Sequence, residues 1–273
     1  MLVFPLCVEM WACRPGPNTV RVATTSSVEN SGLLDEILPA FERQHAVKVE
    51  VLPVGSGQAL GLLERGDAAL GLTHDPGAEA PALAAGIVSD YRKIMFNDFV
   101  IVGPPRDPAG IARASDAVDA MRRIAADGAA FVSRGDASGT YAREQRLWSL
   151  AGQRPAPGQL LETGQGMAAT LRVASEKGAY TLTDRATFEQ FRSDLQLGSL
   201  YEGGPGLLNT YSIFLRASLT GAEREGALAL ADWLADGAGR QLAAGFRVNG
   251  QAVFRVWPAG IPRNQPADLP DAR

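Results

Sequence analysis

From residue 19 onward, short strand-like segments alternate with segments of helical periodicity, and this alternation is the strongest constraint on the fold. The first five segments are a strand, a helix, a strand, a helix and a strand, at residues 19–23, 33–41, 47–51, 55–66 and 68–73. Glycine and hydroxyl residues gather in the turns between them, as in a βαβαβ unit. The pattern predicts an α/β fold in which helices pack on an open sheet.

A second unit of the same kind follows a crossover. The apolar run at residues 99–102 ends in Gly103-Pro104-Pro105, which predicts a buried strand that leaves one domain for another. A strand at residues 207–215 returns the chain, followed by one helix over residues 222–246. Two crossovers predict two lobes, each an open mixed sheet flanked by helices, with a ligand cleft between them. The predicted division is a signal-like leader at residues 1–18, lobe 1 at 19–103 and 207–258, lobe 2 at 104–206, and a flexible tail at 259–273.

The composition excludes several classes of protein. A chain of 273 residues with 46% hydrophobic and 21% charged residues is neither disordered nor a polytopic membrane protein. Its net charge of -4 argues against binding nucleic acid through a general basic surface. Both cysteines, Cys7 and Cys13, precede the folded body, which therefore offers no disulfide, zinc cluster or cysteine nucleophile.

The first thirteen residues form an apolar segment that ends at Arg14-Pro15-Gly16-Pro17. The segment lacks the basic start of an export signal and is too short to span a bilayer. Met10-Trp11-Ala12-Cys13 is similar to a lipoprotein cleavage site, with Cys13 as the lipid-attached residue, and an unstructured leader with incidental cysteines is the alternative. A body without thiols fits a periplasmic or extracytoplasmic location.

Four predicted helix starts carry hydroxyl or glycine residues, two in each lobe. They are Thr25-Ser26-Ser27, Ser56-Gly57, Ser138-Gly139-Thr140 and Thr163-Gly164-Gln165-Gly166. A helix N-terminus exposes unpaired N–H groups and the positive end of a dipole, and small residues let an anion come close. Each start alone is an ordinary N-cap. Four together, each behind a predicted strand, indicate an anion site at the carboxyl ends of the strands.

Arg134 lies directly after a predicted strand and four residues before Ser138, where it would supply one full positive charge. A guanidinium presents several donors in a fixed fork that suits oxyanions, and its alternative role is an ion pair with Asp136. The two histidines, His45 and His74, are expected at the end of a helix or strand rather than as general bases.

Signals for an enzyme are weak. The turn that begins at Gly55 is a near miss of the dinucleotide-binding fingerprint, with one residue too many before the third glycine. No P-loop, Gly-x-Ser-x-Gly elbow or His-Glu-x-x-His motif occurs. Asp98 and Asp184 are candidate carboxylates, but no nucleophile or metal set accompanies them, and we expect them to cap helices or to hold the lobes or the arginine in place.

Six ordered motifs form a specific pattern at residues 23–27 with 31–34, 54–60, 97–104, 133–136 with 138–140, 162–167 and 179–185. Between residues 20 and 254 the chain thereby resembles the bacterial tungstate-binding proteins that feed ABC-type importers, within the two-lobed periplasmic binding-protein superfamily. The resemblance implies the periplasmic binding protein-like fold and a receptor that closes around a tetrahedral oxyanion, with tungstate first and molybdate second. It implies no catalytic residue, cofactor or metal cation.

The implied site draws on both lobes. Its ligand-binding residues are Thr25, Ser26, Ser27 and Ser56 from lobe 1 and Arg134, Ser138, Gly139 and Thr140 from lobe 2. The residues expected around them are Asp136, Gly57, Thr163, Gly164, Gln165, Gly166 and Asp184. The implied partners are the permease and ATPase of the importer. We expect a monomer that binds no nucleic acid and meets the membrane only through a lipid on Cys13.

Two positions depart from the pattern of the family, because Ala137 and Tyr141 replace an aspartate and a histidine that are frequent there.

Three alternatives to a tungstate receptor stay open. Monohydrogen phosphate carries a proton that needs an acceptor, for which Asp136 is a candidate, so a receptor for phosphate or another oxyanion is one alternative. A nucleotide-dependent enzyme built on the turn at Gly55, or a phosphate-ester hydrolase that uses Asp136 or Asp184, is the second. A two-lobed sensor domain that has lost its ligand is the third.

Overall fold

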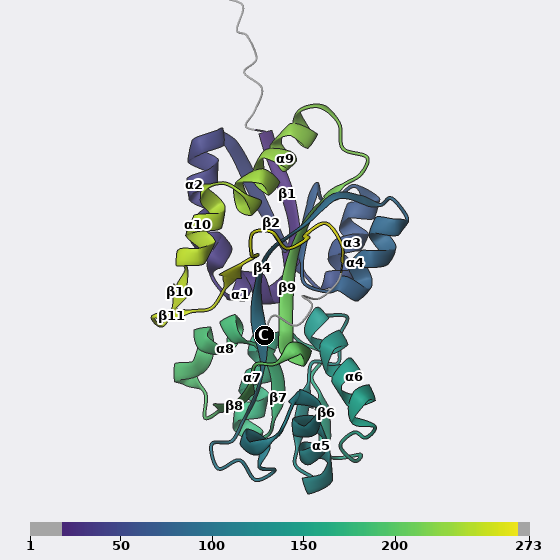
Figure 1. Cartoon of the computed structure of the whole chain (residues 1–273), viewed down its shortest axis with the longest axis vertical. Coiled ribbons are helices and arrows are strands. Elements are labelled where there is room, and N and C mark those ends of the chain that lie inside the picture. Colours follow the sequence, from purple (N-terminus) through teal and green to yellow (C-terminus); the bar gives the residue numbers. More distant parts are fainter. Residues whose placement is uncertain (1–17, 267–273) are drawn as a thin grey trace, which may run out of the picture.

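The structure, a computed structural model, describes residues 18–266, which form two α/β lobes one above the other (Figure 1). Lobe 1, the upper one, is built on a mixed sheet in the order β12-β4-β9-β3-β1-β2. Its strands are β1 (Asn18–Thr25), β2 (Val47–Val54), β3 (Leu70–Thr73), the first part of β4 (Val88–Gly103), β9 (Leu208–Arg216) and β12 (Arg255–Val256). β1 is parallel to both β2 and β3, which confirms the βαβαβ unit.

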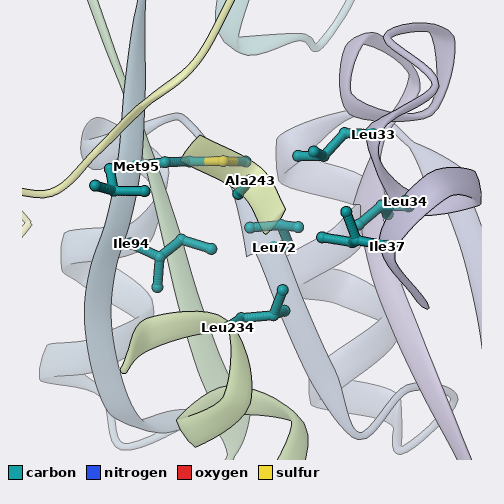
Figure 2. A pocket seen from close by; sticks show the side chains of 9 residues that line it. Leu33, Leu34, Ile37, Leu72, Ile94, Met95, Leu234 and Ala243 are labelled. Atoms are coloured by element: carbon teal, nitrogen blue, oxygen red, sulfur yellow. The ribbon is translucent and has the colours of Figure 1, made fainter. Parts of the chain in front are cut away.

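Helices cover both faces of the lobe 1 sheet. One face carries α2 (Leu33–His45), α9 (Gly221–Ala235) and α10 (Ala238–Gly245), and the other carries α3 (Ser56–Arg65) and α4 (Pro76–Ala84). The apolar residues of α2 recur at helical spacing, and Leu33, Ile37 and Phe41 are almost completely buried against the sheet. Figure 2 shows a small cavity in this core, where Leu33, Leu72 and Leu234 converge. Only apolar side chains line this cavity, so it presents no polar side chain to a ligand.

Lobe 2 carries a second mixed sheet. The last part of β4 pairs with β7 and β8, β5 pairs with β6, and a bridge between Phe131 and Tyr180 joins the two pairs. Its strands are β5 (Phe131–Ser133), β6 (Leu160–Glu162), β7 (Thr181–Asp184) and β8 (Gly198–Glu202). Its helices are α5 (Ala117–Asp127), α6 (Gly139–Ala151), α7 (Met167–Lys177) and α8 (Arg185–Phe191), with single 3₁₀ turns at Ile111–Arg113, Arg192–Asp194 and Pro205–Leu207.

β4 carries the chain from one lobe to the other. It pairs with β9 as far as Asp98 and with β7 from Phe99 onward, so its partners change between these two residues. We propose the lobe boundary at this point, earlier than the one predicted at Gly103. The prediction missed the first half of β4 because polar residues such as Lys93 and Asn97 interrupt its apolar pattern.

The single helix predicted over residues 222–246 is wrong. The chain forms two helices, α9 and α10, which separate at Asp236 and Gly237. A Cβ added at Gly237 would lie 3.0 Å from Trp233 Cα, and one added at Gly239 would lie 2.2 Å from the Trp233 ring. The chain therefore turns tightly around the Trp233 side chain, and only residues without a Cβ allow this path.

The described part of the predicted tail, residues 259–266, is attached to lobe 1. Arg263 forms two hydrogen bonds of 2.7 Å with the carboxylate of Asp236, and its carbonyl oxygen accepts the backbone N–H of Lys93 at 2.8 Å. Trp257 donates its indole N–H to Ile261 O at 3.2 Å. The expectation of a flexible tail is therefore wrong as far as Arg263. The short pair β10 (Arg247–Val248) and β11 (Gln251–Ala252) lies between α10 and this segment.

Candidate anion-binding site

The first predicted loop follows β1 and lies at its carboxyl end. Thr25 is the N-cap of the five-residue helix α1 (Ser26–Asn30), and its Oγ1 accepts the backbone N–H of Val28 at 3.4 Å. The hydroxyl oxygens of Thr25 and Ser27 are 3.0 Å apart, and both side chains are buried, whereas Ser26 is half-buried. The hydroxyl of Thr24 donates to Leu72 O in the sheet at 2.9 Å and is therefore not available to the loop.

His74 extends this hydroxyl pair and was not expected in the site. It follows β3, and its Nε2 lies 3.1 Å from Ser27 Oγ. Burial and the nearby charges of Arg134 and Arg143 lower its pKa from 6.5 to about 3, so the imidazole is neutral at physiological pH. Its position at a strand end was predicted correctly, but its contact with a loop 47 residues away carries no local signal.

Ser56 begins α3 in lobe 1, where Gly55 is the N-cap. The Ser56 side chain is completely buried, and its hydroxyl oxygen has no hydrogen-bond partner among residues 18–266. The side chain of Gln58 accepts the backbone N–H of Gly55 at 3.2 Å and so closes the start of the helix. Gly57 is exposed on the first turn, where an added Cβ would meet open space.

Arg134 follows β5 in lobe 2 and is 4% exposed. Its Nε and Nη2 donate to the same carboxylate oxygen of Asp136, at 3.1 and 2.5 Å. The other oxygen of Asp136 accepts the backbone N–H of Ser138 at 3.3 Å. Arg134 therefore makes the ion pair weighed as its alternative role. Both oxygens of Asp136 take part in holding the loop, so a further hydrogen bond to a ligand would compete with these contacts.

The loop after Arg134 opens α6. Ser138 is the N-cap, and its Oγ accepts the backbone N–H of Tyr141 at 3.2 Å. Gly139 and Thr140 form the first turn, and both are buried. The Thr140 hydroxyl, like that of Ser56, has no partner among the described residues. Buried hydroxyl groups are normally paired, so these two are candidates for contact with a polar ligand.

Two close contacts bring the loops of the two lobes together. A Cβ added at Gly55 would lie 3.0 Å from Ala137 O, and one added at Gly139 would lie 2.9 Å from His74 Cε1. Ser56 and Thr140 are the immediate neighbours of these glycines. The structure thus places an unpaired, buried hydroxyl from each lobe beside the line where the lobes meet.

The fourth predicted helix start supports Arg134. The backbone N–H of Gly164 donates to Arg134 O at 2.8 Å, and the hydroxyl of Thr163 lies 2.9 Å from that of Thr170. Gln165 is exposed, and Gly166 is the N-cap of α7. These residues fix the end of β5.

Asp184 has the structural role expected of it. Its carboxylate accepts the backbone N–H of Thr187 at 2.9 Å and the Thr187 hydroxyl at 2.7 Å, which caps α8. Burial raises its pKa, and the hydrogen bonds from Thr187 and the charge of Arg134 oppose this shift. Both of its oxygens accept hydrogen bonds from Thr187, which is the arrangement of a helix cap.

A polar cluster at the crossing strands was missed by sequence reasoning. The side-chain amide of Asn209 in β9 donates to Asn97 Oδ1 in β4 and to the Tyr211 hydroxyl, both at 2.8 Å. The Tyr211 ring in turn lies 5.1 Å from the ring of His74, measured between centroids. Asn97 and Asn209 lie in strands that carry other polar residues, so neither asparagine stands out in the sequence. The cluster thus links β4 and β9, the strands that run between the lobes, to His74 beside the loop that follows β1.

The chemistry of the assembled groups is that of a donor site. The helix starts of the two lobes meet at Gly55 and Gly139, the charge of Arg134 acts on His74 there, and the carboxylates of Asp136 and Asp184 accept hydrogen bonds from protein groups. Within residues 18–266, no group of three or more His, Asp or Glu side chains is arranged to hold a metal cation. In the same part of the chain, no helix is long and apolar enough to cross a membrane. The arrangement suits an anion that only accepts hydrogen bonds.

Comparisons with known proteins agree with this chemistry. A model described as "PBP superfamily domain" matches residues 14–237. The tungstate-binding protein TupA of Peptoclostridium acidaminophilum is 37% identical over 197 residues, which cover 71% of this chain and 69% of that protein. The chain belongs to the PBP superfamily and, within it, to the family of tungstate-binding proteins. A putative ABC transporter anion-binding protein of Haloferax volcanii is 38% identical over 86% of this chain and 71% of its own length.

Solved structures of the tungstate-binding family confirm the fold. The structure described as the tungstate ABC transporter from Geobacter sulfurreducens has a TM-score of 0.77 and 39% identity, covering 84% of this chain and 98% of its own. The tungstate-binding protein TupA from Desulfovibrio alaskensis G20 has a TM-score of 0.76 and 36% identity, covering 88% and 98%. The α/β periplasmic binding protein-like fold is therefore established, in a family of binding proteins rather than enzymes.

Proposed function

We propose that this chain is an extracytoplasmic receptor that binds tungstate between its lobes and delivers the anion to an ABC importer. Molybdate is the second candidate ligand. One observation supports the proposal: Ser56 and Thr140 present buried hydroxyls, which have no hydrogen-bond partner among residues 18–266, on opposite sides of the lobe interface. Two relatives are named as tungstate-binding proteins, and a third as an ABC transporter anion-binding protein.

The donor set matches the proton state of tungstate. Tungstate is fully deprotonated at neutral pH and only accepts hydrogen bonds, whereas monohydrogen phosphate must also donate one. The nearest carboxylate, Asp136, already accepts from Arg134 and Ser138. A proton on bound phosphate would therefore compete with Arg134 and Ser138 for this carboxylate, and a buried donor left unpaired costs about 1–3 kcal/mol.

In the proposed mechanism, the anion joins the two lobes. Thr25, Ser26, Ser27 and Ser56 donate from lobe 1, and Arg134, Ser138, Gly139 and Thr140 donate from lobe 2. Because the anion contacts both lobes only when they are closed, binding shifts the population toward the closed state. The closed shape is then the signal for the permease and ATPase, our predicted partners.

Attachment of the chain to the membrane stays a prediction. Cys13, the candidate lipid attachment site, lies outside the described residues. Mass spectrometry of the mature protein from a membrane fraction tests this directly, because an acylated N-terminus at Cys13 and an unmodified one differ plainly in mass. A monomer in solution likewise remains our expectation.

Thermal unfolding with a panel of anions tests the function. Dialysed protein is unfolded without anion and with tungstate, molybdate, sulfate or phosphate, in the wild type and in Arg134→Gln. Arg43→Gln makes the same charge change at an exposed position of α2 and is the matched control. A ligand at about a thousand times its dissociation constant adds roughly 4 kcal/mol to the free energy of unfolding.

We expect tungstate and molybdate to stabilise the wild type and the Arg43 variant, and to leave Arg134→Gln unchanged. Stabilisation by phosphate alone would move the protein to the phosphate-receptor alternative. No stabilisation by any of the four anions would overturn the proposal and favour a domain that has lost its ligand.

A further inference from the structure

We propose that His74 is a positioning residue of the anion site: its hydrogen bond to Ser27 fixes the direction of the lobe 1 hydroxyls, and closure of lobe 2 onto its ring locks that arrangement. The inference rests on the proposed function and deepens it, because it names a residue that couples closure to the ligand contacts. The role proposed here concerns Nε2; Nδ1, on the side of Gly139, has no hydrogen-bond partner among residues 18–266.

On the lobe 1 side, His74 ends a short chain of hydroxyl contacts. Ser27 Oγ lies 3.1 Å from His74 Nε2 and 3.0 Å from Thr25 Oγ1, and Thr25 Oγ1 accepts the Val28 N–H. A hydroxyl proton rotates about its C–O bond until a partner fixes it. The two ends of the chain, the backbone N–H of Val28 and the ring nitrogen of His74, cannot rotate in this way. We infer that the tautomer held at His74 Nε2, together with the Val28 N–H, sets which way the protons of Ser27 and Thr25 point.

On the lobe 2 side, the ring is covered by the start of α6. An added Cβ at Gly139 would lie 2.9 Å from His74 Cε1 and 3.0 Å from Nδ1, so the Gly139 backbone is in contact with the ring. Tyr211 and Phe99 lie against other parts of the imidazole, with centroid distances of 5.1 and 6.1 Å. The His74 side chain thus contacts both Ser27 in the loop after β1 and Gly139 at the start of α6. With lobe 2 in this position, the ring has little room to turn.

In this proposal, His74 orients the Ser27 hydroxyl and supplies no positive charge to the anion. Two positive groups, Arg134 and Arg143, act on His74, and together with burial they lower its pKa to about 3. The imidazole is therefore neutral in this structure over the physiological pH range. A neutral ring adds no cation for the anion, but it is a fixed hydrogen-bonding partner for Ser27.

Two substitutions separate hydrogen bonding from packing. His74→Gln keeps an amide near the place of Nε2 that can donate or accept, whereas His74→Leu fills a similar volume without a hydrogen bond. The tungstate dissociation constant is measured by titration calorimetry at pH 7.5, and urea unfolding of the anion-free proteins checks that each variant folds. We expect His74→Gln to bind within about threefold of the wild type and His74→Leu to bind about tenfold more weakly. Equal affinity of His74→Leu and the wild type, or equal losses in both variants, would overturn the proposal.

A double-mutant cycle with Ser27 tests whether His74 acts through the hydroxyl. If it does, His74→Leu weakens tungstate binding in the wild-type background but changes it by less than about twofold in Ser27→Ala. Additive losses would mean that His74 acts independently of Ser27 and would refute the positioning role. If His74→Leu folds poorly, His74→Met replaces it in the cycle, because methionine also lacks a hydrogen-bonding group at the place of Nε2. A wild type that binds no tungstate would instead refute the proposed function, so the two failures are distinct.

Discussion

The backbone of Gly139 in lobe 2 packs against the imidazole of His74 in lobe 1. A Cβ added at Gly139 would lie only 2.9 Å from His74 Cε1. The contact joins the first turn of α6, which presents Thr140, to the residue that holds Ser27. The start of α6 therefore packs against the residue that contacts the loop after β1, so the position of each affects the other. The fit between the lobes is made by backbone and ring atoms, which cannot move aside as a flexible side chain would.

Gly139→Ala is expected to weaken anion binding without unfolding the protein. The added methyl group would press on His74 and keep the lobes from closing fully, whereas the open form avoids the clash. We predict a tungstate affinity at least about tenfold lower by titration calorimetry, with the unfolding midpoint of the anion-free protein little changed. Gly245→Ala is the control, because nothing lies within 4 Å of a Cβ at that position in α10. Equal affinities in the two variants would show that the contact is not required for closure.

Glu144 gives the stability of the protein a pH dependence. Its side chain accepts hydrogen bonds from Ser133 at 2.8 Å and Trp148 at 3.2 Å, and burial raises its pKa from 4.5 to about 7. Because the folded state binds this proton more tightly than the unfolded chain, the free energy of unfolding falls as the pH rises from 4.5 to 7 and levels off above 7. The shift corresponds to about 3 kcal/mol.

Glu144→Gln is expected to remove this dependence. In urea unfolding between pH 4.5 and 8, the variant should gain stability relative to the wild type as the pH rises, and the difference should level off above pH 7. A constant difference across the whole range would show that Glu144 does not titrate in this window.

His74 gives a dependence of the opposite sign. Its pKa of about 3 in the folded protein, against 6.5 for the free side chain, means that the unfolded chain binds the proton first as the pH falls. The contribution of neutral His74 to stability is therefore complete above pH 6.5 and is lost toward pH 3, at about 1.4 kcal/mol per pH unit. Anion-free His74→Gln should lose less stability than the wild type between pH 6.5 and 4.5. Parallel profiles would mean that His74 is exposed enough to ionise in the folded state.

The fold could be predicted where the sequence pattern is local. The spacing of Leu33, Ile37 and Phe41 predicts α2 because all three face the same sheet, and the first three strands follow from short apolar runs. β4 could not be predicted over its full length, since it pairs in two lobes and its polar residues face different surroundings along its course. The break between α9 and α10 depends on the Trp233 ring, which a pattern of apolar residues does not locate.

The residues of the site also divide into those that a local sequence pattern marks and those that it does not. Arg134, Ser138 and Thr25 follow strands and open helices, so their turn chemistry marks them in the sequence. His74 and Asn209 carry no such mark, because their partners come from elements far along the chain. The engagement of Asp136 by Arg134 also depends on side-chain geometry, and it changes Asp136 from a candidate acceptor into the partner that holds the arginine.

Titration calorimetry of the dialysed wild type with tungstate, molybdate, sulfate and phosphate tests the central claim most directly. We predict one anion per chain, with tungstate and molybdate bound at least about a hundredfold more tightly than sulfate or phosphate. The unpaired hydroxyls of Ser56 and Thr140 are the reason to expect binding at the lobe interface, so Ser56→Ala and Thr140→Val should each lower the tungstate affinity. Absence of tungstate binding, or tighter binding of phosphate than of tungstate, would contradict the account.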